Sequence, residues 1–326
     1  MKNKFFAVIT PTYNRAHLLP RCFESLQSQT FKDFAWYIGD DGSTDNTEEV
    51  VKELINKSTF PIYYFKFSHR GKHHTVQELL KKVQANYLLS LDSDDEFYNE
   101  YSFQNFYDKI QKLPSDIPFW GIAGCFINQY DKIFPVFSEK YIDIAKDNFF
   151  DFLTKNADKL NIFCVQNLEY INQYQNPVSD DELPYYPEMV GILKTVLMSK
   201  DYRYRLFNEP FYRYHQFLSD SVSQKHSDVE NYGAVGIANL FYEYHLSDKY
   251  RKYLNNIIFQ MAKKIKNKKI IFEIQSKFSN PKDRKYFLYC VHFRKYFKYV
   301  FNIEQINSKT KFWLLGIKIY TYKRKK

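Results

Sequence analysis

Short apolar segments alternate with amphipathic segments along residues 5–127. Apolar and β-branched residues predict strands at 5–10, 34–38, 62–67, 87–91 and 120–127. Between the first four of these, apolar residues recur at helical spacing and predict helices near 18–26, 45–55 and 76–83. This alternation is typical of an α/β domain with a mostly parallel, doubly wound sheet, which binds ligands at the carboxyl ends of its strands.

Polar groups follow the first four predicted strands at that edge of the sheet. Thr10–Arg15 contains the aromatic ring of Tyr13, and Asp40–Ser43 places two carboxylates beside a glycine. His69–Lys72 is a basic loop, and Asp92–Asp95 is an acidic cluster. Together they match the parts of a nucleoside diphosphate: the ring stacks on the base, a carboxylate accepts a base N–H or a ribose hydroxyl, and the lysine approaches phosphate.

The acidic cluster is the most informative of these segments, because three carboxylates follow a short apolar strand in YLLSLDSDD. Crowded carboxylates repel one another unless a cation or a hydrogen-bonding ligand lies among them. Mg²⁺ and Mn²⁺ prefer such oxygen ligands. The sequence therefore predicts that Asp94 and its neighbours hold one of these ions together with a phosphorylated ligand.

The segments VITPTYNR, IGDDGSTDNT, HRGKHHT and LLSLDSDD, in this order and spacing, resemble family two of the inverting glycosyltransferases, of the bacterial surface-polysaccharide or lipooligosaccharide type. The resemblance is dense over residues 5–100 and thinner afterwards. It implies the GT-A fold, which is Rossmann-like, and a nucleotide-diphosphate sugar donor, expected to be a UDP-sugar. The implied acceptor is a lipid-linked or cell-surface glycan.

The resemblance also implies roles for individual residues. It assigns the nucleoside of the donor to an aromatic ring and a carboxylate, the ribose to the first acid of the cluster, and the metal to the later acids. The implied donor-binding residues are Pro11, Tyr13, Asp41, Lys72 and Asp92, and the implied metal ligands are Asp94 and Asp95.

Several of these residues have a structural alternative. Tyr13 covers a helix end in that alternative, Asp41 forms a turn, and Asp95 caps the segment that follows the strand. Asp40 is expected to be structural. His215 either completes the metal shell or packs as a core histidine among tyrosines.

An inverting transfer needs a base that removes a proton from the acceptor hydroxyl. In the family this base is a carboxylate in an acidic ED-like motif upstream of an NEP-type segment. Here Asn208–Pro210 reads NEP, and counting back leads to Glu188, although Met189 stands where the second acid is expected. Asp181 is the alternative base, and a first-turn helical position is the structural alternative for Glu188.

The absent ED pair leaves a second hypothesis from another class. In that hypothesis the GT-A domain is catalytically silent and binds a nucleotide sugar or a partner as a scaffold. The intact LDSDD segment argues against it.

Charge divides the chain unevenly. Residues 1–248 hold 25 Lys and Arg against 34 Asp and Glu, a balance of −9, whereas residues 249–326 hold 22 against 3, a balance of +19. In the second segment the basic residues alternate with aromatic and aliphatic ones, which favours an anionic membrane surface. An ordinary basic helical subdomain is the alternative. We expect no nucleic-acid partner, because no recognition signature for nucleic acid accompanies the charge.

We therefore expect a GT-A catalytic domain over residues 1–220 and a basic, aromatic, mainly helical region over 221–326. Within the domain, residues 1–127 bind the nucleotide sugar and 128–220 bind the acceptor. Cys22, Cys125, Cys164 and Cys290 show no CxxC spacing, which favours reduced thiols. With an apolar run at 5–9 too short for a signal peptide, this predicts a cytoplasmic protein on the inner face of the membrane.

Overall fold

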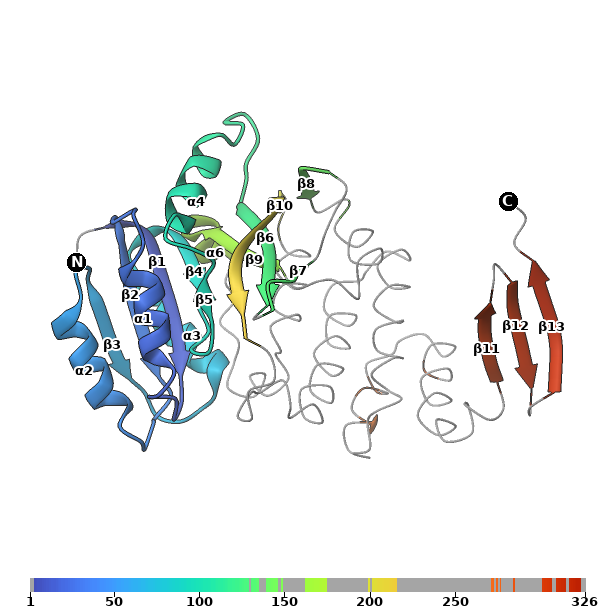
Figure 1. Ribbon diagram of the computed structural model, residues 1–326, viewed down its shortest axis with the longest axis horizontal. Coiled ribbons are helices and arrows are strands. Elements are labelled where there is room, and N and C mark those ends of the chain that lie inside the picture. Colours follow the sequence, from blue (N-terminus) through green and yellow to red (C-terminus); the bar gives the residue numbers. More distant parts are fainter. Residues whose placement is uncertain are drawn as a thin grey trace. The chain divides into compact units, whose positions relative to one another are not determined.

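The apolar segments near the N-terminus form parallel neighbouring strands of one sheet (Figure 1). Their order in the sheet is β3-β2-β1-β4, so β1 lies between β2 and β4. Each is followed by a helix or by the acidic loop. The strands are β1 Lys4–Thr12, β2 Phe34–Asp40, β3 Ile62–Lys66 and β4 Ala85–Ser90, and the helices are α1 Leu19–Gln27, α2 Thr47–Lys57 and α3 Lys72–Leu80.

Beyond β4 the sheet becomes mixed, in the order β4-β9-β6-β10-β5. Strand β9 runs antiparallel to both β4 and β6, and β10 runs parallel to β6 and antiparallel to β5. β7 pairs with β6, and β8 pairs with β10. These elements are β5 Glu96–Phe97, α4 Ser102–Gln111, β6 Gly121–Asn128, β7 Ile133–Phe134, β8 Tyr141–Ala145, β9 Ile162–Asn167, α6 Leu168–Tyr174 and β10 Arg203–Tyr214.

Side chains alternate between the two faces of the parallel strands and build a separate apolar cluster on each. Phe6 and Val8 of β1 belong to the cluster that packs under α1, α2 and α4. Ala7 and Ile9, which alternate with them, belong to the cluster under α3 and α6. A strand covered on both faces reads as a continuous apolar run, which explains why FFAVI in β1 shows no polar alternation.

The strand register brings the predicted polar segments to one edge of the sheet. Thr12 pairs with Asp40 across β1 and β2, and Asp40 pairs with Lys66 across β2 and β3. On the other side of β1, Ile9 pairs with Ser90 at the end of β4. The loops that follow these strands therefore start side by side, as the alternating pattern predicts.

The computed structural model describes residues 3–128, 130–134, 139–145, 148, 162–174, 199, 201–215, 271, 272, 274, 276, 284, 301–306, 309–314 and 317–323. The chain divides into one unit of residues 1–183 with 191–224 and another of 184–190 with 225–326. No helix among the residues of the ranges just given has the length and apolar character that crossing a membrane requires.

The second unit contains a three-stranded antiparallel sheet in the order β11-β12-β13. Its strands are β11 Phe301–Ile306, β12 Lys309–Leu314 and β13 Ile317–Lys323. The expectation of a mainly helical region is wrong for these residues, although 271, 272, 274, 276 and 284 are helical. The physical reason lies in the sequence IKIYTYK, where β-branched and aromatic residues predominate and favour a strand.

Candidate functional site

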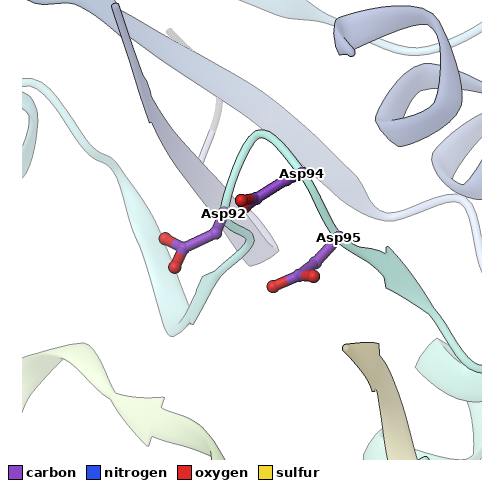
Figure 2. Close-up of side chains that lie close together, drawn as sticks. All are labelled: Asp92, Asp94 and Asp95. Atoms are coloured by element: carbon purple, nitrogen blue, oxygen red, sulfur yellow. The ribbon is translucent and has the colours of Figure 1, made fainter. Parts of the chain in front are cut away.

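Three carboxylates gather on the short loop between β4 and β5 (Figure 2). Asp92, Asp94 and Asp95 each offer one oxygen, and these atoms all lie within 4.8 Å of one another. The loop is tight, because the Asp95 amide donates to the Asp92 carbonyl at 3.0 Å. The spacing D-x-D-D after a buried strand therefore produces the carboxylate cluster that the sequence predicts.

The thiol of Cys22 on α1 lies beneath this loop and was not anticipated. It approaches the carbonyl oxygens of Asp92, Ser93 and Asp95 at 3.6, 3.3 and 3.2 Å. Burial, followed by the nearby charge of Asp95, raises the pKa of this thiol, so it stays protonated and acts as a donor. Sequence inspection gave no signal for this contact, because the cysteine and the loop are some 70 positions apart.

Two basic side chains contact the first two acids of the cluster. The Lys72 ammonium, at the start of α3, lies 2.7 and 2.9 Å from the two carboxylate oxygens of Asp92. Arg15, in the loop after β1, places Nη1 at 3.1 Å from Asp94 Oδ2. The sequence predicts Lys72 as a phosphate contact and predicts no role for Arg15. Both cations therefore lie close enough to the cluster to contact an anionic ligand that binds there.

Asp95 is bound into the end of β10. Its carboxylate accepts hydrogen bonds from the Tyr212 hydroxyl and from the His215 amide, the latter at 2.8 Å. Burial, followed by the charge of Asp94, raises the pKa of Asp95 to about 8. The imidazole of His215 lies 3.0 Å from a carboxylate oxygen of Glu96, and this hydrogen bond lowers the pKa of Glu96. Asp95 therefore links the acidic loop to the C-terminal end of β10.

The donor set of the cluster fits a divalent cation. Three carboxylate oxygens within 4.8 Å of one another need small side-chain movements to share an ion at the 2.0–2.6 Å distances of Mg²⁺ or Ca²⁺. Asp92 and Asp94 present their oxygens to the cationic side chains of Lys72 and Arg15, whereas Asp95 has neutral donors. The arrangement can hold Mg²⁺ or Mn²⁺ through Asp92 and Asp94, with Asp95 as the third acid.

Asp41, the predicted nucleoside ligand, organises the loop that follows β3. Its buried carboxylate accepts from the amides of Arg70 and Gly71 at 2.9 Å each and from the Thr75 hydroxyl at 3.1 Å. The His69 ring nitrogen lies 2.8 Å from the same carboxylate. Gly71 has φ of 97°, a conformation that glycine adopts without strain. Asp41 thus fixes the basic loop, which includes the start of α3.

Tyr13 presents its ring at the same edge of the sheet. The ring is 40% exposed and stacks on His69, with centroids 4.1 Å apart and planes 18° apart. The loop around Tyr13 is held by Asn14, whose amide donates to Ser43 Oγ at 2.9 Å. Pro11 is buried in β1 opposite Gly39. The flat face of Tyr13 is suited to stacking, and in this structure a histidine covers it.

Asp40 has different hydrogen-bond partners from Asp41. Its carboxylate accepts from the Ser43 amide at 2.7 Å and from the Tyr64 hydroxyl at 2.5 Å, and it is fully buried. These contacts close the turn after β2, which is a structural role. The predicted base Glu188 and its alternative Asp181 lie outside the described residues.

Residues 7–167 match the model of glycosyl transferase family 2. A glycosyltransferase named GlyA from Streptococcus pneumoniae is 28% identical over 156 residues, which are 48% of this chain and 20% of that protein. A GalNAc(5)-diNAcBac-PP-undecaprenol beta-1,3-glucosyltransferase from Campylobacter jejuni is 33% identical over 91 residues, 28% of this chain and 29% of that one. The chain thus matches less than a third of either relative's length.

Solved structures share the fold at lower identity. The crystal structure of S. aureus TarS 1–349 in complex with UDP-GlcNAc matches with a TM-score of 0.57 and 15% identity, covering 95% of this chain and 97% of that one. A mannosyltransferase from Pyrobaculum calidifontis, in complex with GDP-Man and Mn²⁺, matches with a TM-score of 0.52 and 12% identity, covering 85% and 74%. At these identities the likeness concerns the fold.

Proposed function

We propose that this chain, whose residues 7–167 belong to glycosyl transferase family 2, transfers a sugar from a nucleoside-diphosphate donor to a glycan acceptor with inversion at the transferred carbon. The observation that carries this proposal is the convergence of Tyr13, Lys72 and the acidic loop at one edge of the sheet. A stacking ring, a cation and a carboxylate cluster are the groups that bind base, phosphate and metal.

In the proposed complex the base lies on Tyr13, and the ribose hydroxyls approach Asp92. Lys72 and Arg15 lie beside the diphosphate, where negative charge develops as the glycosidic bond breaks, and their positive charge stabilises the leaving group. Asp92, Asp94 and Asp95 would hold a divalent cation, which would supply further charge stabilisation of that diphosphate. Hydrogen bonds to Asp41 and Asp95 hold the basic loop and the acidic loop in place, so side chains rather than the main chain have to move when the donor binds.

We assign removal of the acceptor proton to Glu188, with Asp181 as the alternative. Inversion requires this carboxylate to lie on the face of the sugar opposite the leaving diphosphate. Replacing Glu188 with Gln keeps the shape of the side chain and removes its basicity. If Glu188 is the base, Glu188→Gln lowers the transfer rate by about 100-fold or more while donor binding stays unchanged, and Asp181→Asn has little effect. The reverse result assigns the base to Asp181.

The proposed donor is a UDP-sugar, and the proposed acceptor is a lipid-linked or cell-surface glycan. The bound UDP-GlcNAc of the S. aureus neighbour supports the donor. The name of the Campylobacter relative, which refers to an undecaprenol-linked glycan, supports the acceptor. We also propose that the basic segment 249–326 holds the protein against an anionic membrane surface, because its charge balance is +19.

The test combines binding and turnover. Thermal unfolding with UDP-sugars and Mn²⁺ is expected to show a higher midpoint than the same mixtures with chelator, because a ligand of the native state stabilises it. Asp94→Ala should abolish transfer, with a loss of at least about 100-fold, while the protein stays folded. Exposed Asp116 gives the matched control Asp116→Ala, which should retain activity. Normal transfer by Asp94→Ala would refute the assignment, and binding without transfer by the wild type would favour the scaffold hypothesis.

A further inference from the structure

The acidic loop already carries two cations from the chain itself, and this arrangement bears on how the donor is bound. Arg15 and Asp94 form a largely enclosed ion pair, with side-chain exposures of 14% and 11%. Lys72 and Asp92 form a more open pair, with exposures of 43% and 38%. Two positive charges therefore offset the negative charges of Asp92 and Asp94 when no ion is bound.

A divalent ion and these side chains compete for the same oxygens. An ion at Asp92 and Asp94 adds two positive charges within a few ångströms of Arg15 and Lys72, and like charges at that range repel strongly in a partly enclosed site. A guanidinium that donates to a carboxylate oxygen also occupies the lone pairs that the ion needs. Metal binding is therefore expected to displace the Arg15 side chain from Asp94.

The backbone around Arg15 is fixed, so only its side chain has to turn. The Asn14 amide donates to Ser43 Oγ at 2.9 Å, and the Ala16 amide donates to Asp45 Oδ2 at 3.2 Å. The Arg15 carbonyl accepts from the Leu18 amide at 3.0 Å. A long, flexible side chain on a pinned backbone can exchange one anionic partner for another without unfolding the loop.

We propose that Arg15 is a placeholder for the metal on Asp94 and becomes a diphosphate ligand when the ion takes its place. This inference rests on the proposed function, since it names how that site couples its two ligands. Arg15 suits the second role because its planar guanidinium binds phosphate oxygens in pairs. Lys72 makes the same exchange between Asp92 and phosphate as a point charge.

The exchange predicts opposite effects of one substitution. Without Arg15 the ion meets no competing cation on Asp94, so Arg15→Gln should bind Mn²⁺ alone about threefold to tenfold more tightly than the wild type. The same variant lacks a charged phosphate ligand, so its affinity for UDP at saturating Mn²⁺ should fall by at least about tenfold. If Arg15 had only a structural role, Arg15→Gln would weaken the binding of both Mn²⁺ and UDP.

Isothermal titration measures both constants on the full chain, first with Mn²⁺ alone and then with UDP or GDP at saturating Mn²⁺. Arg15→Lys keeps the charge, so it should lose the gain in Mn²⁺ affinity and recover part of the nucleotide affinity. Arg21→Gln is the matched control, because Arg21 contacts the same residue through the main-chain oxygen of Asp94. Arg21→Gln leaves the carboxylate oxygens of Asp94 as they are, so it should tighten Mn²⁺ binding less than Arg15→Gln does.

Weaker or unchanged Mn²⁺ binding by a folded Arg15→Gln variant overturns the placeholder role, and so does unchanged nucleotide affinity. Thermal unfolding of each variant shows whether it is folded. If the wild type binds neither UDP nor GDP with Mn²⁺, the proposed function itself fails. If the wild type binds the nucleotide and only the opposite effects are missing, the proposed function stands and this inference falls.

Discussion

A single buried thiol links the core of the domain to the acidic loop. Cys22 Sγ approaches three main-chain oxygens of that loop at 3.2–3.6 Å, from the interior side of α1. Thiols are weak hydrogen-bond donors, but the carbonyls that face this buried thiol have few other donors within reach. Position 22 therefore controls both local stability and the placement of the carboxylates.

We expect Cys22→Ala to lower the free energy of unfolding by about 1–3 kcal/mol, because it removes the thiol donor that faces the buried carbonyls of Ser93 and Asp95. It should also weaken Mn²⁺ binding, because the loop loses its support. Urea denaturation and titration calorimetry measure the two effects. Cys125→Ala is the control, since Cys125 is buried on β6 and contacts Phe207 O and Asn208. Loss of Mn²⁺ affinity in both variants alike would contradict a specific role for Cys22.

His73 on α3 makes the stability of the domain sensitive to acid. Burial, followed by the charge of Lys72, lowers the pKa of His73 to about 4. Between about pH 4 and pH 6.5 the unfolded chain binds a proton that the folded chain does not, so stability falls as the pH falls through this window. His73→Gln should flatten this dependence, by about 1–3 kcal/mol between pH 7 and pH 4.

Denaturation midpoints at several pH values measure this dependence, and the exposed His17 provides the matched control His17→Gln. His17→Gln should keep the slope of the wild type. Equal slopes for the wild type and His73→Gln would show that another group causes the acid sensitivity.

The sequence predicted residues whose role follows from their type and their place after a strand. Tyr13, Asp41, Lys72 and Asp94 all lie at the predicted edge, because the alternation of strands and helices places them there. Arg15 was not predicted to pair with Asp94, although TYNR was part of the recognised segment. Its partner lies almost 80 positions away along the chain. Whether the guanidinium contacts solvent, phosphate or a carboxylate depends on side-chain packing that no local pattern encodes.

At the scale of elements, α3 and β2 pack closely enough to transmit strain to the site. A Cβ added at Gly39 would lie 2.6 Å from Thr75 Cγ2 and 2.8 Å from Leu79 Cδ1. Thr75 also donates its hydroxyl to Asp41 at 3.1 Å. Any shift of α3 away from β2 therefore moves a hydrogen-bond donor of the carboxylate that holds the basic loop.

Gly39→Ala should destabilise the domain by about 1–3 kcal/mol through overpacking and should weaken nucleotide binding through Thr75. The double variant Gly39→Ala with Thr75→Ser removes the nearest methyl group and keeps the hydroxyl. It should therefore cost less than the sum of the two single variants in urea denaturation. Additive costs would mean that the helix does not respond to this contact.

Strand β5 was not predicted from the sequence, because it depends on a distant partner. Strand β5 is two residues long and pairs with β10, which lies more than 100 positions further along the chain. A segment this short carries no periodicity of its own. Strands β1 and β2 were predictable because they are buried on both faces and therefore read as apolar runs.

At the scale of the whole molecule, the uneven charge is the feature with most bearing on where the protein acts. Segment 1–248 is acidic overall and segment 249–326 carries +19, a difference that evenly scattered lysines would not produce. A nucleotide-sugar donor diffuses freely, whereas a lipid-linked acceptor is confined to a bilayer. Attraction of the basic segment to an anionic surface would concentrate the chain at the bilayer, where the proposed lipid-linked acceptor lies.

This idea predicts salt-dependent binding of the full chain to vesicles. Vesicles that contain phosphatidylglycerol should retain the protein at low ionic strength and release it at about 0.5 M salt, because screening shortens the range of the attraction. Each basic residue near such a surface contributes about 1 kcal/mol, so replacing Lys263, Lys264, Lys266, Lys268 and Lys269 with Gln should reduce binding by more than 100-fold. The matched control replaces the exposed Lys52, Lys57, Lys81, Lys82 and Lys112 of the first unit with Gln and should bind like the wild type.

Sedimentation with phosphatidylcholine vesicles separates charge from apolar insertion, because these vesicles carry no net charge. If both sets of five substitutions weaken binding equally, the attraction depends on total charge and the segment has no special role. If the full chain stays unbound at low salt with anionic vesicles present, the basic residues serve another purpose, and the proposed acceptor must reach the site without help from this segment.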